Sequence, residues 1–284
     1  MRKVAIVTDS TAYIPQDLRE QYGVTVVPQV LIWGEKTYED DIDIKPDEFY
    51  QKLQTAKVMP TTSQASVPNM QKAFSGLLEK GYDVLGIFIS SKLSGTIQSA
   101  LQGRELLEKD REHVEIVDSQ TTAMAMGFQV LTVARAAAQG ASLAECKALA
   151  EKTRAHTGVY FVVDTLEFLH RGGRIGGAQR LLGTALNLKP ILTVADGKVE
   201  AVERIRTKTK AIERLIEIVA EKTAGQSPMR IASLHANAAA EARAMLETLR
   251  TRVNAIESIH STVSPVIGTH IGPGTVGVAY MAGM

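Results

Sequence analysis

Short apolar runs alternate with amphipathic helical stretches along the first half of the chain. The runs are rich in β-branched residues and have the length of buried strands. They cover Lys3–Thr8, Val24–Ile32, Asp83–Ile89 and Val114–Val117. Residues at helical spacing separate these runs, and the helices are expected at Pro46–Gln54, after Ser66, after Thr96 and at Thr122–Gln139. Strands that alternate with helices predict a parallel sheet that is covered by helices on both faces.

The second half has a different order of elements. Asp196-Gly197, between two apolar runs, predicts a two-residue hairpin turn. The other strands are expected at Gly158–Val163, Arg230–Leu234, Ala255–Thr262, Val266–Ile271 and Val276–Met281. The helices are expected at Ala178–Leu186, Lys210–Lys222 and Ala238–Arg250. This order predicts a mixed sheet with helices on one face.

The chain is long enough for two domains, because it has 284 residues. We therefore expect an α/β protein whose N-terminal domain, residues 1–156, is a three-layer α/β/α unit with a parallel sheet. The C-terminal domain, residues 157–284, is expected to be a two-layer α+β unit with a mixed sheet. No linker rich in proline or serine marks the boundary, which we place near His156.

Charge and composition limit the classes of function. The chain has 32 basic and 31 acidic residues, a net charge of +1, which argues against nucleic acid as a partner. No apolar run reaches about 18 residues, and the chain starts directly with a strand pattern. We expect neither a signal peptide nor an integral membrane segment, and at most transient contact with a membrane. The single cysteine, Cys146, favours a cytoplasmic location and a buried thiol.

A polar stretch at Ser90–Thr96 lies between a predicted strand and a predicted helix. A helix start carries free backbone N–H groups and a partial positive charge, so it favours a negative group on a ligand. Ser94 is therefore a candidate for binding a carboxylate. Asp9–Thr11 and Thr61–Gln64 are also polar, and they are placed to converge with Ser90–Thr96 at the carboxyl ends of the parallel strands. Helix capping is the alternative role for Asp9 and Ser10.

Two further patterns bear on metal and nucleotide binding. The acidic run between Thr37 and Ile44 does not have the frame of a calcium loop, so we expect a solvated turn there and no metal site. A G-x-G-x-x-G sequence starts at Gly272, but too few residues follow it to build a dinucleotide fold. Its glycines instead predict a tight turn between two strands, which makes the preceding His270 a candidate site residue.

The segment Arg171-Gly172-Gly173-Arg174 permits two interpretations. It has the composition of a phosphate-binding nest. It also fits a structural turn with arginines that face solvent, and this second interpretation is the one we favour.

Short motifs spread along the whole chain resemble those of the DegV family, in the family's order. They are Thr8-Asp-Ser-Thr11, Pro60-Thr-Thr-Ser-Gln64, Ser90-Ser-Lys-Leu-Ser-Gly-Thr96, Phe168-Leu-His-Arg-Gly-Gly-Arg-Ile175, Arg204-Ile-Arg-Thr207 and His270-Ile-Gly-Pro-Gly274. The resemblance implies a two-domain α/β protein that binds one long-chain fatty acid between its domains. It also implies a carrier without catalysis or a cofactor of its own, which presents the acid to a separate fatty acid kinase subunit that makes the acyl phosphate.

The resemblance also implies roles for individual residues. Thr62 and Ser94 occupy the positions whose hydroxyls hydrogen-bond the carboxylate. Arg206 and His270 occupy positions next to the head group or in contact with the kinase. A second layer around these residues is expected from Ser63, Gly95, Asp9 and Ser10.

Two alternatives remain open on the sequence. Ser94, His270 and an acid such as Asp9 could form a hydrolase triad, although the G-x-S-x-G elbow is missing. A small-anion or nucleotide-binding module that uses Arg171–Gly177 is the other alternative.

Overall fold

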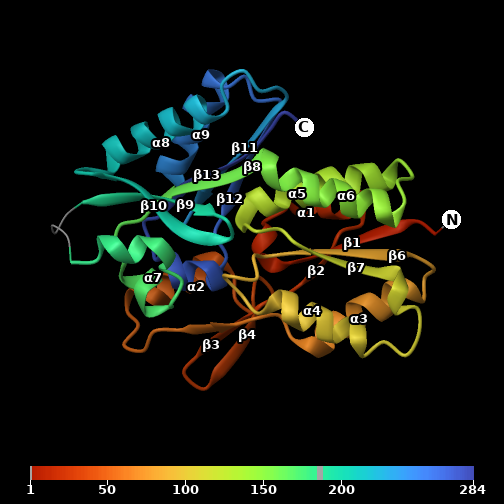
Figure 1. Ribbon diagram of the computed structural model, residues 1–284. Coiled ribbons are helices and arrows are strands. Elements are labelled where there is room, and N and C mark those ends of the chain that lie inside the picture. Colours follow the sequence, from red (N-terminus) through yellow and green to blue (C-terminus); the bar gives the residue numbers. More distant parts are fainter. Residues whose placement is uncertain (1, 184–187) are drawn as a thin grey trace.

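A computed structural model describes residues 2–183 and 188–284 (Figure 1). The N-terminal sheet has the strand order β2-β1-β6-β7, and all its pairs are parallel. Its strands are β1 (Val4–Asp9), β2 (Thr25–Val27), β6 (Asp83–Phe88) and β7 (Val114–Asp118). The helices α3 (Val67–Leu78) and α4 (Thr96–Glu105) cover one face. The helices α5 (Ala123–Ala138) and α6 (Leu143–Thr153) cover the other face, with α1 (Gln16–Tyr22) beside α5. The predicted three-layer unit is confirmed.

The C-terminal sheet is mixed, with the order β10-β9-β8-β13-β11-β12. β11 and β12 pair in parallel, whereas the other neighbours are antiparallel. The strands are β8 (Thr157–Val162), β9 (Lys189–Ala195), β10 (Lys198–Ile205), β11 (Met229–His235), β12 (Glu257–Thr262) and β13 (Val276–Ala282). α8 (Lys208–Lys222) and α9 (Ala239–Arg252) pack on one face, as predicted for a two-layer unit.

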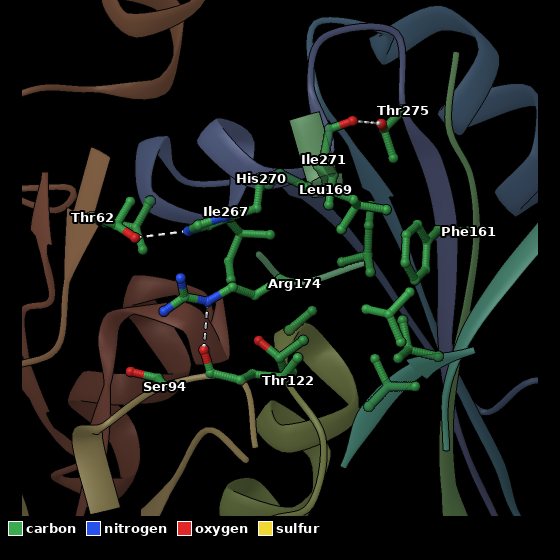
Figure 2. A pocket seen from close by; sticks show the side chains of 18 of the residues that line it. Thr62, Ser94, Thr122, Phe161, Leu169, Arg174, Ile267, His270, Ile271 and Thr275 are labelled. Carbon is green, nitrogen blue, oxygen red and sulfur yellow. Dashed lines mark hydrogen bonds between the residues drawn. The ribbon is translucent and has the colours of Figure 1, made fainter. Parts of the chain in front are cut away.

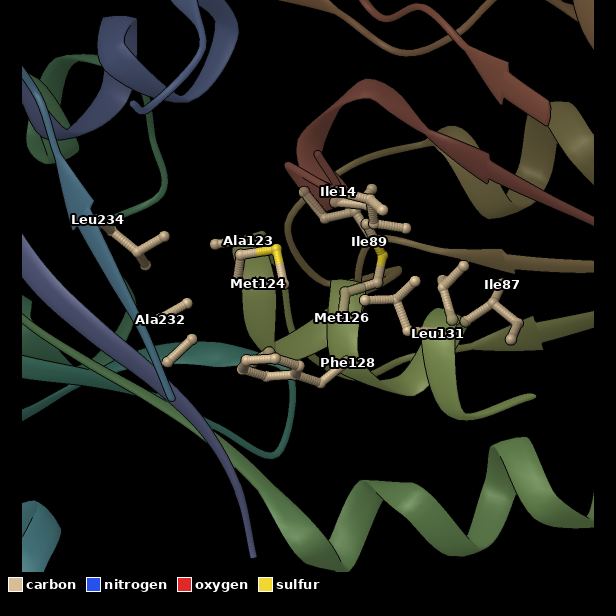
Figure 3. Packing of buried hydrophobic residues seen from close by; sticks show 14 of the residues in the cluster. Ile14, Ile87, Ile89, Ala123, Met124, Met126, Phe128, Leu131, Ala232 and Leu234 are labelled. Carbon is tan, nitrogen blue, oxygen red and sulfur yellow. The ribbon is translucent and has the colours of Figure 1, made fainter. Parts of the chain in front are cut away.

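The helix α5 packs against both sheets. Its side chains are buried almost all round, as its continuous apolar sequence predicts. Figure 3 shows Met126 and Leu131 of α5 near Ile87 of β6, and Met124 nearer to Leu234 of β11. One apolar cluster therefore extends from the parallel sheet through α5 to the mixed sheet.

A small antiparallel sheet, in the order β4-β3-β5, corrects two predictions. It contains β3 (Val30–Trp33), β4 (Lys36–Glu39) and β5 (Thr61–Ser63), and α2 (Pro46–Gln54) lies between β4 and β5 in the chain. The run Val24–Ile32 was predicted as one strand but forms β2 and β3 in different sheets, because Pro28 interrupts the run. The polar Thr61–Gln64 segment was not among the predicted strands, but Thr61–Ser63 pairs with β3.

Two more predictions were wrong: a strand near the end of the chain, and a solvated turn in the acidic run. Val266–Ile271 was predicted as a strand, but it belongs to the helix α10 (Pro265–Ile271). Periodicity cannot separate a strand from a helix in so short an apolar run, and Pro265 is favourable in a first helical turn. Asp40 of the acidic run is not solvated, because it is 1% exposed and accepts from Ser10 Oγ at 2.7 Å and from Val266 N at 3.1 Å.

The glycine-rich basic segment contains a short helix, α7 (Glu167–Arg171), that the sequence analysis did not predict. A 3-10 helix follows at Gly176–Leu181 in the first part of the helix predicted at Ala178–Leu186. The rest of that prediction extends into residues 184–187, which lie outside the described residues.

The predicted hairpin between β9 and β10 contacts the Ser90–Thr96 stretch. Asp196 and Gly197 have φ values of 48° and 78°, which a type I′ turn requires. Ser90 Oγ donates to the Gly197 carbonyl at 2.9 Å, and Lys92 Nζ donates to the Asp196 carbonyl at 2.7 Å. The hairpin thus links the mixed sheet to the loop that carries Ser94.

This contact predicts that Gly197→Ala destabilises the protein more than Gly34→Ala. Both glycines have positive φ, but a Cβ at Gly197 would lie 2.4 Å from Ser90 Oγ, whereas none of the described atoms lies within 4 Å at Gly34. The backbone conformation costs each alanine variant about 1 kcal/mol, and the overlap at Gly197 adds about 1–3 kcal/mol. Urea unfolding measures both, and equal losses would contradict the contact.

Candidate functional site

A largely apolar cavity lies where β8, β11, α10 and the Ser90–Thr96 loop meet. Its empty volume, which includes the open solvent at its mouth, is about 830 Å³. Apolar side chains that line it include Val159, Phe161, Leu169, Val194, Leu234 and Ile267. The lining therefore suits an apolar ligand.

Polar side chains gather at one end of this cavity (Figure 2). Thr62, Ser94, Arg174 and His270 lie there, and Phe161 lies at the opposite side of the view. We call these four residues the polar end. Thr62 belongs to β5, and Ser94 lies in the loop before α4. Arg174 lies in the turn after α7, and His270 belongs to α10. The cavity is therefore mainly apolar, with a group of polar side chains at one end, and Thr122 and Thr275 add hydroxyls elsewhere on its wall.

His270 connects to Thr62 across the polar end. Thr62 Oγ1 and His270 Nε2 are 2.7 Å apart. The histidine is 8% exposed, and its Nδ1 has no hydrogen-bond partner among the described residues. Burial, with a contribution from the charge of Arg174, lowers the pKa of His270 to about 4, so the ring is neutral at pH 7. Gly172 leaves room for the ring, because a Cβ there would lie 2.1 Å from Nδ1.

Ser94 lies at the start of α4, as predicted. Its Oγ accepts from Thr96 N at 3.3 Å and lies 2.9 Å from Thr96 Oγ1. Ser94 Oγ also donates to Gln29 Oε1 at 3.5 Å. Gly95 itself caps the helix without a side chain and packs against Gln64. The hydroxyl of Ser94, just before α4, therefore lies at the same end of the cavity as Thr62.

Arg174 belongs to the polar end, although the sequence analysis favoured a solvent-facing turn for it. Its Nε donates to the Leu93 carbonyl at 3.0 Å and its Nη1 to the Gly172 carbonyl at 2.7 Å. Arg171, in contrast, is exposed and pairs with Glu167. Two arginines in one glycine-rich turn were visible in the sequence, but only the fold separates the inward one from the outward one.

Asp9 and Ser10 lie behind the polar end and do not line the cavity. Asp9 is fully buried and accepts from Thr11 N, Thr11 Oγ1, Gln29 Nε2 and Ile89 N. Burial raises the pKa of Asp9, while these donors oppose the rise. Asp9 caps the 3-10 turn Ser10–Ala12, whereas α1 begins without a side-chain cap. Its bond to Gln29 fixes the amide whose oxygen faces Ser94.

The other candidate residues are placed differently. Ser63 lines the cavity next to Thr62. Arg206 is exposed just after β10 and does not line the cavity. Ser10 Oγ donates to Asp40 at 2.7 Å instead of facing a ligand.

The hydrolase alternative lacks its relay of hydrogen bonds. In the described structure His270 Nε2 contacts Thr62 rather than Ser94, and Asp9 bonds neither Ser94 nor His270. Metal-ligand types gather elsewhere in the described residues, at Asp110, Glu112 and His113, which do not line the cavity. Within residues 2–183 and 188–284, no helix combines the length and apolarity needed to cross a bilayer.

Fold and site together define a class of α/β protein with a buried apolar cavity that is polar at one end. The chain belongs to the DegV family, because the family model described as an uncharacterised protein of the DegV family matches residues 3–283. A DegV domain-containing protein of Streptomyces coelicolor is 40% identical over 279 residues, which cover 98% of each chain. Protein DegV of Bacillus subtilis is 37% identical over 280 residues, again 98% of each chain.

Solved structures agree with this assignment. A DegV family protein from Thermus thermophilus, described with fatty acid binding, superposes with a TM-score of 0.91 at 38% identity, over 99% of both chains. DegV from Bacillus subtilis, described as a fatty acid binding protein, gives a TM-score of 0.89 at 34% identity, over 99% of this chain and 100% of the other.

The low pKa of His270 predicts a loss of stability in acid. The unfolded chain binds a proton on this histidine below about pH 6.5, whereas the folded chain does so only near pH 4. The free energy of unfolding therefore decreases as the pH is lowered through this window. For this residue the decrease is about 2 kcal/mol between pH 7 and pH 5. Urea unfolding of the ligand-free protein should show a smaller fall in His270→Gln. The exposed His170→Gln is the control, and an unchanged fall in His270→Gln would contradict the prediction.

Proposed function

We propose that this protein binds one long-chain fatty acid, with the carboxylate at the polar end and the tail in the cavity. The observation that carries this proposal is the largely apolar cavity with polar groups gathered at one end. The relatives from Thermus thermophilus and Bacillus subtilis, described as fatty acid binding, support the same ligand class.

The tail and the carboxylate of the ligand contribute different amounts to the binding free energy. Burial contributes about 0.8 kcal/mol per CH₂, so a long tail supplies on the order of 10 kcal/mol. A hydrogen bond to a charged group contributes about 1.5–3 kcal/mol. The tail therefore dominates affinity, and the polar end fixes where the carboxylate lies.

The polar end has groups that suit a carboxylate. Thr62 and Ser94 offer hydroxyls, that of Ser94 by exchanging its long 3.5 Å bond to Gln29 Oε1 for the carboxylate, and the guanidinium of Arg174 offers a positive charge beside them. A buried carboxylate without partners would be strongly disfavoured, and these donors remove that penalty. The neutral His270 orients Thr62 through the 2.7 Å contact.

We further propose that the protein is a carrier that presents the acid to a separate fatty acid kinase. A second hollow shares Thr62, Arg174 and His270 with the cavity. Met59, Phe168 and Arg171 also line this hollow. A carboxylate held at the polar end is thus approachable from outside through this hollow, where the kinase would meet it. The exposed Arg206 is a candidate contact for the kinase elsewhere on the surface.

The binding proposal predicts that organic extraction of the purified protein releases long-chain fatty acid, detected by mass spectrometry at about one per chain. Arg174→Met should weaken binding of added palmitic acid about tenfold, because it removes the charge near the carboxylate. Arg250→Met on α9 is the matched control, since this arginine is exposed, paired with Glu247 and away from the cavity. Absence of lipid, with no binding of added acid, would refute the proposal.

The carrier proposal predicts separate effects on uptake and on phosphorylation. Thr62→Val and Ser94→Ala should reduce acyl phosphate formation by a fatty acid kinase at least tenfold and reduce the amount of bound lipid much less. Thr248→Val, an exposed change on α9, is the control. Kinase turnover equal to that of the unchanged protein in both site variants would contradict their assigned role.

A further inference from the structure

One hydroxyl on the wall of the cavity has no protein partner. Thr122 lines the cavity and is 8% exposed. Its Oγ1 is buried and makes no hydrogen bond within the described part of the chain. A buried hydroxyl without a partner is unfavourable, so such a group in a ligand cavity points to a polar group on the ligand.

The backbone around Thr122 adds donors at the same place. Thr122 is the N-cap residue of α5, and its side chain does not cap the helix. The first N–H groups of a helix have no partner within the helix, and they carry its partial positive charge. Ala123, the first residue of α5, also lines the cavity. Thr122 and Ala123, at the start of α5, therefore both lie on the wall of the same cavity.

The position of Thr122 relative to the polar end limits where a ligand group would lie. Ser90 N donates to the Thr121 carbonyl at 2.9 Å, which ties this segment to the loop that carries Ser94. Figure 2 shows Thr122 between Ser94 and Phe161, on the side of Arg174. A group that reaches Thr122 would therefore be carried by a carbon near the carboxyl end of the chain.

We propose that Thr122 and the start of α5 form a subsite for a hydroxyl group near the carboxyl end of the bound acid. The ligand class is a long-chain hydroxy acid, and the inference rests on the proposed fatty acid binding. A hydroxyl both donates and accepts, so it can accept from the helix N–H groups and pair with Thr122 Oγ1. A plain methylene at this point leaves Thr122 unpaired, and the subsite thus favours the hydroxylated acid.

Competition binding to ligand-free protein tests this with palmitic acid, 3-hydroxypalmitic acid and 16-hydroxypalmitic acid. The unchanged protein should prefer the 3-hydroxy acid to palmitic acid, and Thr122→Val should shift the ratio of their two Kd values about tenfold towards palmitic acid. Valine keeps the shape of threonine without the hydroxyl. Thr122→Ser should retain the preference, and the 16-hydroxy acid should gain nothing from Thr122.

The neighbouring Thr121 provides a matched control. It is 6% exposed, and its Oγ1 also lacks a partner among the described residues, but it does not line the cavity. Thr121→Val should therefore leave the ratio unchanged. A ratio that Thr122→Val does not alter would overturn the subsite while palmitic acid binding stands. Failure of all three acids to bind would overturn the fatty acid proposal as well.

Discussion

The burial of α5 between the two sheets is the packing interaction on which the rest of the molecule depends. A helix that is apolar all round must be covered on every side, and here the parallel sheet and the mixed sheet both contribute. The apolar cluster that results fixes how the two halves of the chain lie relative to each other. The cavity lies next to the N-terminal end of this helix, since Thr122 and Ala123 are on its wall. The shape of the cavity is therefore a consequence of the same packing.

The relative positions of the residues at the polar end depend on hydrogen bonds between the segments that carry them. The β9–β10 hairpin holds the loop of Ser94 through Ser90 and Lys92. Arg174 bonds the Leu93 carbonyl of the same loop, which ties the turn after α7 to it. Each of these bonds joins residues from different halves of the chain. Local rearrangement in either half would thus move the donors that we assign to the carboxylate.

The resemblance to the DegV family brought Thr62, Ser94 and His270 to attention, and all three line the cavity. The pattern of residues alone supported Ser94 best, because a hydroxyl between a strand and a helix start is a local feature. Arg174 was missed, because the direction of a side chain in a glycine-rich turn depends on what packs against that turn. Asp9 was visible as a polar residue after a strand, but its burial beneath Gln29 follows from the sheet.

The alternation of strands and helices, the type I′ turn at Asp196-Gly197 and the continuous burial of α5 could be predicted from the sequence, because they follow from local periodicity and backbone preference. The helix at residues 265–271 and the strand pairing of Thr61–Ser63 depend instead on tertiary packing. The same holds for the contact of Thr62 with His270, which is 208 residues away in the chain. Short segments are ambiguous in their own periodicity, and a contact between distant residues depends on packing that no local pattern encodes.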